Sequence, residues 1–190
     1  MLLLVGLGNP GSNYTNTRHN IGFKIIDAIN THFKLSKQKP KFKGLLTTGN
    51  IDEKKIYAIK PLTFMNNSGT AIKELIDYFK IDAKDVFVFH DDMDIDFGKI
   101  KAKFGGSSAG HNGIESIDKF IGKDYSRVRI GIGHPKQKKK VNNHVLEDFK
   151  EDEEEKMKEI TENIVKQLPT LIEKKIDLFS SKVNQDLNGI

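Results

Sequence analysis

The chain has 190 residues, a length that fits one domain whose core needs no covalent cross-links. It contains no cysteine, which excludes disulfides, a thiolate nucleophile and a cysteine-bound metal, and which favours a cytoplasmic location. No apolar run approaches the roughly 20 residues of a membrane span, and the first residues lack the basic start of a signal peptide.

Charge is distributed unevenly along the chain, whose formal net charge is +5. Lysines gather within residues 34–43, 99–103 and 136–140, whereas acidic residues gather within 147–155. Any one of these groups could be a solvated surface. Their separation along the chain predicts a basic face that meets a polyanion and an acidic face elsewhere.

Apolar strands and amphipathic helices alternate through the whole sequence. The expected elements are a strand over residues 2–5, a helix over about 20–33, a hairpin over 42–59, a helix over 68–79, strands over 86–89 and 99–104, a helix over 111–121, a strand over 127–133 and a long helix over 157–176. The run over 86–89 is apolar throughout, which is typical of a strand buried on both faces, so we place it at the sheet centre. Residues 184–189 are expected to be frayed.

This alternation predicts an α/β fold, a three-layer sandwich in which a twisted mixed β-sheet is flanked by helices. The chain has no linker, repeat or low-complexity boundary. We therefore expect residues 1–190 to form a single domain.

The first strand leads into residues 6–11, where three glycines have the spacing of a loop that holds a dinucleotide pyrophosphate. In that motif a helix opens directly after the last glycine. Here turn-forming residues occupy positions 12–17, and the acidic residue expected about 20 positions onward at a strand end is missing. A plain turn, or an active-site loop that carries Asn9 and His19, explains the glycines better.

Three further loops place polar residues near the ends of strands, at 61–69, 90–94 and 105–113. In an open α/β sheet, ligands bind beyond the carboxyl ends of the strands. Asparagine amides in such loops donate and accept hydrogen bonds at fixed geometry, which suits the positioning of a carbonyl substrate and a water molecule around a histidine.

The loop after the expected central strand offers His90, Asp91, Asp92 and Asp94 as ligands for a metal ion. Aspartates after a strand also commonly form turns. A single carboxylate directed at a histidine would instead fix its tautomer and raise its basicity. We favour Asp91 as the partner of His19 over Asp91 as a metal ligand.

Residues 106–110 match the G-x-S-x-G nucleophile elbow, in which Ser108 would attack an ester. Its partners could be Asp118 with His134 or His144. The elbow requires the end of a buried central strand, whereas the preceding strand alternates lysines with apolar residues. A flexible Gly/Ser loop is the simpler explanation.

Long motifs follow one another along the chain: Gly6-Leu7-Gly8-Asn9-Pro10-Gly11, Tyr14, Thr17-Arg18-His19-Asn20-Ile21-Gly22, residues 61–69, His90-Asp91-Asp92-Met93-Asp94, Gly110-His111-Asn112-Gly113 and residues 127–135. With these motifs in this order, the chain resembles the bacterial-type peptidyl-tRNA hydrolase family over nearly its full length. The resemblance implies a monomeric esterase that uses no cofactor and no metal. Such an enzyme cuts the ester between a peptide and the 3′ ribose of tRNA, and so recycles tRNA from abortive translation and rescues ribosomes.

The resemblance also implies roles for individual residues. His19 would be the general base that takes a proton from water, and Asp91 would orient it. Asn9 and Asn66 would position the peptide and the ester, and Asn112 would bind near the water or the 3′ end. An ordinary histidine, with a pKa near ~6.5, can act as a base at neutral pH.

Further contacts with peptidyl-tRNA are implied for its acceptor stem, 5′ phosphate and 3′ end. The residues implied in substrate and tRNA binding are Tyr14, Phe64, Met65, Asn66, His111, Asn112, Lys103 and Arg129. The last two match positions associated with clamping the 5′ phosphate, and lysines 136–140 are a plausible additional contact. Ala109 stands where the family usually has glycine, which implies a stiffer loop. A serine esterase that uses Ser108 and a non-catalytic RNA- or nucleotide-binding module are the alternatives.

Overall fold

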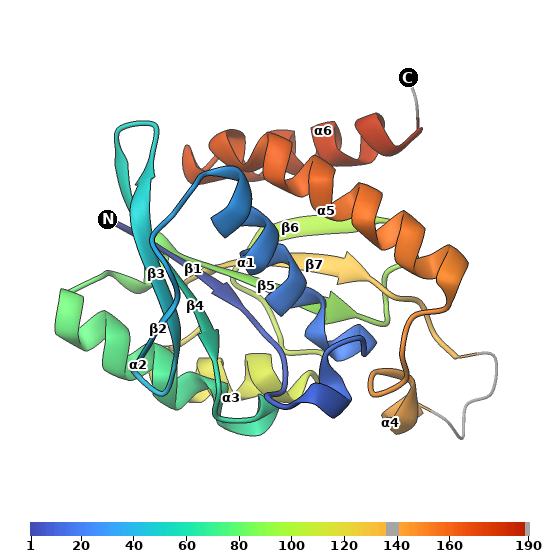
Figure 1. The fold of residues 1–190 in the computed structure, drawn as a ribbon, viewed down its shortest axis with the longest axis horizontal. Helices are drawn as coiled ribbons and strands as arrows, with labels where there is room; N and C mark the ends of the chain where they lie inside the picture. Colours follow the sequence, from blue (N-terminus) through green and yellow to red (C-terminus); the bar gives the residue numbers. More distant parts are fainter. Residues whose placement is uncertain (136–140, 189–190) are drawn as a thin grey trace.

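The computed structural model describes residues 1–135 and 141–188. One seven-stranded sheet runs through them in the order β2-β3-β4-β1-β5-β7-β6 (Figure 1). The strands are β1 (Leu2–Gly6), β2 (Lys39–Lys41), β3 (Gly44–Ile51), β4 (Lys54–Pro61), β5 (Val86–Asp92), β6 (Ile100–Phe104) and β7 (Ser126–Gly131). The neighbours from β4 to β7 are parallel, whereas β2, β3 and β6 join antiparallel at the two edges.

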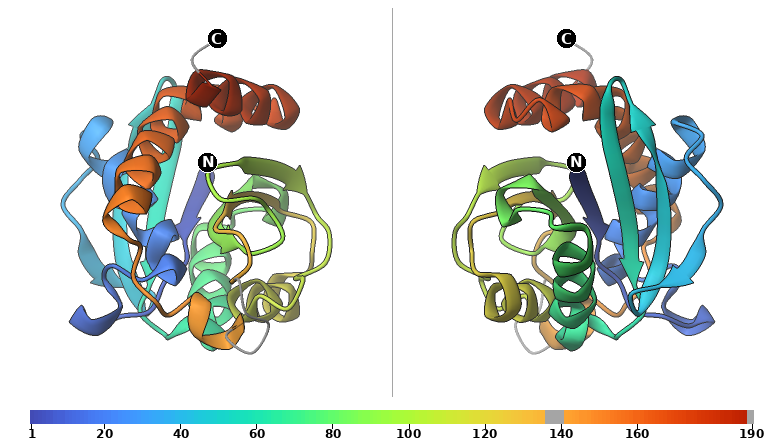
Figure 2. Two further views of the ribbon diagram at one scale, coloured as in Figure 1. Left: turned by 90° about the vertical axis from the view of Figure 1, so that its right-hand side faces the viewer. Right: turned by 90° about the vertical axis from the view of Figure 1, so that its left-hand side faces the viewer.

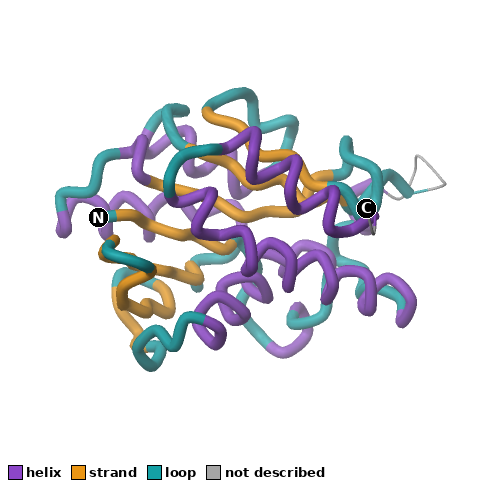
Figure 3. The backbone as a smooth tube through the Cα atoms, turned by 90° about the horizontal axis from the view of Figure 1, so that it is seen from above, coloured by secondary structure: helices purple, strands orange, loops and turns teal. Residues whose placement is uncertain are grey.

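Helices cover both faces of this sheet. They are α1 (Ile21–His32), α2 (Ser68–Phe79), α3 (Asn112–Ile121), α4 (Val141–His144), α5 (Glu151–Ile172) and α6 (Ile176–Asn188). Helices α1 and α5 pack on one face and α2 and α3 on the other (Figure 2). Seen from above, the strands run between helices (Figure 3). The predicted three-layer sandwich with a mixed sheet is confirmed. None of the described helices is both long and apolar enough to span a membrane.

The strand sequences explain the two cores. Along β1, Leu2 and Leu4 point to the core under α1 and α5, whereas Leu3 and Val5 point to the core over α2 and α3. Successive side chains of a strand alternate between faces, so a strand covered on both sides is apolar throughout. The middle strand is β1 rather than the predicted strand over 86–89, which belongs to β5 and lies directly beside it.

The C-terminal helix was not predicted. Residues 184–188 of the expected frayed end belong to α6, and residue 189 lies outside the described residues. The expected helix over 157–176 begins earlier, at Glu151, and ends at Ile172. Helix α6 covers the edge strand β6, where Ala102 N donates to Ser180 Oγ at 2.8 Å and Ile100 N donates to Asn184 Oδ1 at 3.0 Å. Asn184 Nδ2 also donates to Ile100 O at 2.9 Å. Polar residues that look like a solvated tail therefore satisfy the backbone of an exposed strand edge.

The glycines at and after the end of β1 allow close packing and a sharp turn of the chain. A Cβ on Gly6 would lie 2.2 Å from Gly22 O, so the end of β1 touches the first turn of α1 through two glycines. Gly11 turns the chain with a φ of 109°, a value that other residues rarely adopt. The phosphate-loop interpretation is not needed to explain this spacing.

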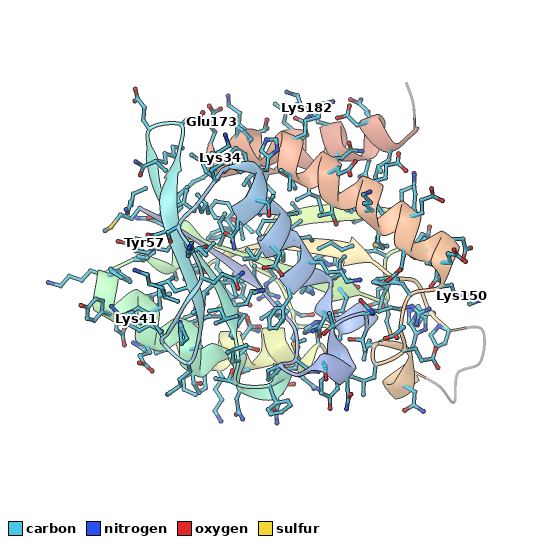
Figure 4. All side chains as sticks on the ribbon, viewed as in Figure 1. Lys34, Lys41, Tyr57, Lys150, Glu173 and Lys182 are labelled. Atoms are coloured by element: carbon cyan, nitrogen blue, oxygen red, sulfur yellow. The ribbon has the colours of Figure 1, made fainter. Side chains whose placement is uncertain are left out.

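The lysine groups lie at opposite edges of the sheet. Residues 34–43 run from the end of α1 through the edge strand β2. Figure 4 labels Lys34 at the start of this segment and Lys41 at the end of β2. Residues 99–103 lie along β6 at the other edge. The third group, 136–140, lies outside the described residues. The first two groups are separated by the width of the sheet, so the expectation of one basic face does not hold for them.

Candidate active site

A cleft of about 690 Å³ opens where the carboxyl ends of β1 and β5 meet the loop before α3. Its lining residues are Asn9, His19, Phe64, Met65, Asn66, Asp91, Asp92, Met93, Asp94, Ser108, Ala109, Gly110, His111, Asn112, Val145 and Leu146. All five residues predicted to be catalytic border this one cleft. Parallel strands bring these distant segments together because their carboxyl ends share one edge.

His19 and Asp91 form a buried pair. The 3-10 turn Arg18–Asn20 directs His19 toward the end of β5, where its Nδ1 lies 2.8 and 2.9 Å from the two carboxylate oxygens of Asp91. The side chains are 9% and 2% exposed. Since a carboxylate only accepts, Nδ1 carries the proton. Nε2 has no partner among the described residues, and its lone pair is available as a base.

His111 gives Asp91 a second donor. It is the N-cap of α3, and its Nδ1 accepts from the backbone N–H of Gly113 at 3.1 Å and of Ile114 at 3.3 Å. Nε2 therefore carries a proton, which it donates to Asp91 Oδ1 at 3.0 Å. One imidazole ring thus links the free N–H groups at the start of α3 to the carboxylate of Asp91 by hydrogen bonds.

Electrostatics keep Asp91 ionised and its neighbour His90 neutral. Burial opposes the Asp91 charge, but the attraction and hydrogen bonds of His19 and His111 outweigh it, so the pKa of Asp91 lies well below its usual value. Burial, followed by repulsion from His111, holds the pKa of His90 well below its usual range. His90 Nδ1 donates to Asp91 O at 2.7 Å.

Asn9 is held by its backbone and its side chain. Asn20 Oδ1 accepts from Asn9 N and Asn20 Nδ2 donates to Asn9 O, both at 2.9 Å. Asn9 Oδ1 accepts from Met65 N at 2.9 Å, which leaves the Asn9 amide group NH₂ as the donor for the cleft. Asn20 was not among the predicted site residues, although its place directly after His19 could have suggested a role.

Asn66 and Asn112 are exposed at the border of the cleft, in the 3-10 turn Met65–Asn67 and at the start of α3. Phe64 is half exposed, and its φ of 57° is rare for a residue with a side chain. Tyr14 is absent from the lining but meets the Phe64 ring edge-on at 6.4 Å. These side chains give the cleft both amides and an aromatic rim.

Lys103 and Arg129 lie beside the cleft rather than in its lining. Arg129 Nε is 2.7 Å from Asp92 Oδ2, and Asp92 borders the cleft. A Cβ on Gly106 would lie 2.4 Å from Lys103 Nζ, so this ammonium lies against the loop before α3. Partial burial, followed by repulsion from Arg129 and Arg127, lowers the pKa of Lys103. Clustered cations of this kind attract phosphate.

The ligand set considered for a metal, namely His90, Asp91, Asp92 and Asp94, does not converge. Asp92 accepts from Arg129 and Asp94 N, and Asp94 pairs with His134 at 2.8 Å. Another set does converge, because His19, Asp91 and His111 each place a ligand atom within 4.8 Å of the others. In that set the two imidazoles already donate to the carboxylate, which favours the orienting role of Asp91.

The nucleophile-elbow interpretation of Ser108 finds no geometric support in the described part of the chain. Its hydroxyl has no hydrogen bond to a described histidine. The acid proposed for it, Asp118, accepts from Tyr125 Oη and Arg127 NH2, both at 2.7 Å. The histidines proposed for it are also engaged elsewhere: His134 pairs with Asp94, and His144 Nε2 lies 3.3 Å from Ile132 O.

The fold and the site define an α/β enzyme with a histidine–carboxylate pair in an asparagine-lined cleft. A family model described as peptidyl-tRNA hydrolase matches residues 3–189. A peptidyl-tRNA hydrolase of Pelagibacter ubique is 72% identical over 184 residues, which cover 97% of this chain and 99% of the relative. One of Bartonella henselae is 44% identical over 189 residues, which cover 100% of this chain and 98% of the relative.

A comparison with solved structures leads to the same family. The crystal structure of peptidyl-tRNA hydrolase from Acinetobacter baumannii has a TM-score of 0.90 at 34% identity, over 97% of this chain and 94% of that one. The chain belongs to the peptidyl-tRNA hydrolase family. It is accordingly a hydrolase of peptidyl-tRNA that acts in translation.

Proposed function

We propose that His19 is the general base of the hydrolysis and that Asp91 orients it. The observation that carries this proposal is the pairing of His19 Nδ1 with both oxygens of a buried carboxylate, in a cleft bordered by three asparagines. A histidine whose Nδ1 proton is held in this way has Nε2 free to accept a proton.

In the proposed step, His19 Nε2 takes a proton from a water molecule that attacks the ester carbonyl carbon. The resulting imidazolium is stabilised by Asp91, and the tetrahedral oxyanion accepts hydrogen bonds from side-chain amides. Asn9, Asn66 and Asn112 are the candidate donors. Collapse of the intermediate breaks the bond to the 3′ oxygen of the ribose, which takes the proton from the His19 imidazolium and so regenerates the base. No metal or cofactor takes part in this step.

The substrate contacts follow from the surroundings of the cleft. Phe64, Met65 and Tyr14 would contact the peptide or the terminal base, because apolar and aromatic surfaces bind such groups without reading their sequence. Lys103 and Arg129 would bind the 5′ phosphate of the acceptor stem. We further propose that the whole chain acts as one cytoplasmic, monomeric catalytic domain that returns tRNA from abortive translation.

The mechanism is tested by hydrolysis of a peptidyl-tRNA by the wild type and by His19→Ala and Ser108→Ala variants. Loss of the general base is expected to lower kcat by about 10³-fold, whereas Ser108→Ala should change it at most a few-fold. Circular dichroism spectra verify that both variants fold. Retained turnover in His19→Ala would contradict the mechanism, and its loss in Ser108→Ala would revive the serine esterase.

A further inference from the structure

Arg18 and His19 are consecutive residues of one 3-10 turn, and both are buried. His19 faces Asp91, whereas the Arg18 side chain faces the chain that enters α5. Only 4% of the Arg18 side chain is exposed. A guanidinium is always charged, so its burial requires several acceptors.

The surroundings of Arg18 form a seam, by which we mean the backbone pairing of residues 16–19 with residues 145–149. Its hydrogen bonds run from His19 N to Val145 O at 2.8 Å, from Arg18 N to Glu147 O at 3.0 Å and from Phe149 N to Asn16 O at 3.4 Å. Figure 1 shows the orange chain before α5 beside the dark blue chain after β1. Val145 and Leu146 line the cleft, so the seam holds one of its walls.

The Arg18 guanidinium binds backbone carbonyls of the chain that forms this wall. Its NH1 group donates to His144 O at 3.2 Å and to Glu147 O at 3.3 Å. Its NH2 group donates to Glu153 Oε2 at 2.8 Å, and its central carbon lies 5.6 Å from the centre of the Phe149 ring. The planar group spans two carbonyls and a carboxylate together, which a lysine ammonium does not match.

The carboxylate that binds Arg18 is itself fixed. Lys150, labelled in Figure 4 at the start of α5, donates its backbone N–H to Glu153 Oε2 at 2.9 Å. Glu153 therefore caps α5 and pairs with Arg18 through the same oxygen. Because α5 packs along α1, the wall is anchored to a long helix of the sandwich.

We infer that Arg18 is a positioning residue that holds the Val145–Leu146 wall of the cleft beside His19. This inference rests on the proposed binding of peptidyl-tRNA in that cleft. Val145 contacts His19 through its backbone carbonyl, which accepts from His19 N, and neither Val145 nor Leu146 bonds to the imidazole of His19 or the carboxylate of Asp91. Loosening the wall should therefore weaken the binding of substrate and leave the proton transfer intact.

Arg18→Gln tests the inference in steady-state hydrolysis of peptidyl-tRNA. KM is expected to rise about tenfold, with kcat and the pH profile of kcat close to those of the wild type. Hydrogen exchange of the Arg18 and His19 amides should become faster, because these amides donate across the seam. Arg18→Lys keeps the charge and should show a smaller rise in KM.

Lys24→Gln is the matched control. Lys24 Nζ lies 5.7 Å from the centre of the same Phe149 ring and 3.5 Å from Glu154 of α5, but it has no contact with the seam carbonyls. This variant should keep the wild-type KM. If Arg18→Gln does not fold, Glu153→Gln replaces it as the test variant. This change removes the carboxylate charge that faces Arg18 and retains a side-chain oxygen for Lys150 N. The KM of Glu153→Gln should also rise.

An unchanged KM in folded Arg18→Gln, with only a lower melting temperature, would overturn the inference and leave Arg18 a purely structural residue. An equal rise in KM in Lys24→Gln would overturn it as well. Failure of the proposed mechanism has a different signature, namely retained turnover in His19→Ala.

Discussion

At the scale of single residues, the proposed chemistry depends on one carboxylate with two imidazole donors. Asp91 Oδ1 receives hydrogen bonds from His19 Nδ1 and His111 Nε2. His111 cannot turn its ring without losing the cap of α3. The carboxylate is therefore held in place from one side while it orients the proposed base on the other, which is the purpose of a base–orienter pair.

Asp91→Asn should lower kcat for peptidyl-tRNA by about 10³-fold, because an amide that donates to His19 Nδ1 places the imidazole proton on Nε2 and removes the base. The measurement is single-turnover hydrolysis with the variant in saturating excess over the substrate. Asp96→Asn, an exposed change in the following loop, is the control. Comparable rates for the Asp91 variant and the wild type would argue against the orienting role.

At the scale of elements, α6 closes an edge of the sheet. β6 has one strand neighbour, and its outer backbone groups bond to Ser180 and Asn184 instead of a further strand. An unpaired strand edge can recruit other chains, and covering it with a helix is one remedy. The polar composition of α6 is thus required by the strand that it covers.

Ser180→Ala should lower the free energy of unfolding by about 1 kcal/mol, because Ala102 N loses its acceptor. Asn184→Ala should lower it more, since Asn184 satisfies both Ile100 N and Ile100 O. Ser181→Ala is the control, because the neighbouring Ser181 is exposed. Urea unfolding gives the three values, and an equal effect of both serine changes would refute the edge contact as the cause.

At the scale of the whole molecule, the buried histidine at the end of β5 links folding to pH. His90 is only 3% exposed, and burial holds its pKa well below the usual range. Below about pH 6.5 the unfolded chain takes up a proton at this position and the folded chain does not. The unfolded state then binds more protons, so stability falls as the pH falls.

The free energy of unfolding should therefore decrease from pH 6.5 to pH 5 by up to about 1.4 kcal/mol per pH unit through His90. In His90→Asn this part of the slope should disappear, as measured by urea unfolding at several pH values. Asp91 acts in another window, because its depressed pKa gives stability that is present above about pH 3.9 and lost below it. An unchanged slope in His90→Asn would contradict this assignment.

The layers of the fold and the chemistry of its loops were predictable from the sequence. Continuous apolar runs predicted strands covered on both faces, and the helix over 68–79 has the predicted bounds. Asn9, His19, Asn66, Asp91 and Asn112 each lie in a polar loop next to a strand or helix end, and the family resemblance of those loops implied their roles. These are local patterns, readable from neighbours along the chain.

Only the tertiary structure decided how those patterns combine. The strand order places β1 between β4 and β5, and so brings His19 to Asp91, 72 positions away, and Arg18 to Glu153, 135 positions away. It also separates the lysine groups of β2 and β6 to opposite edges and turns an apparent tail into the cover of β6. Periodicity carries information about the faces of one element, whereas the pairing of distant elements depends on packing across the whole sheet.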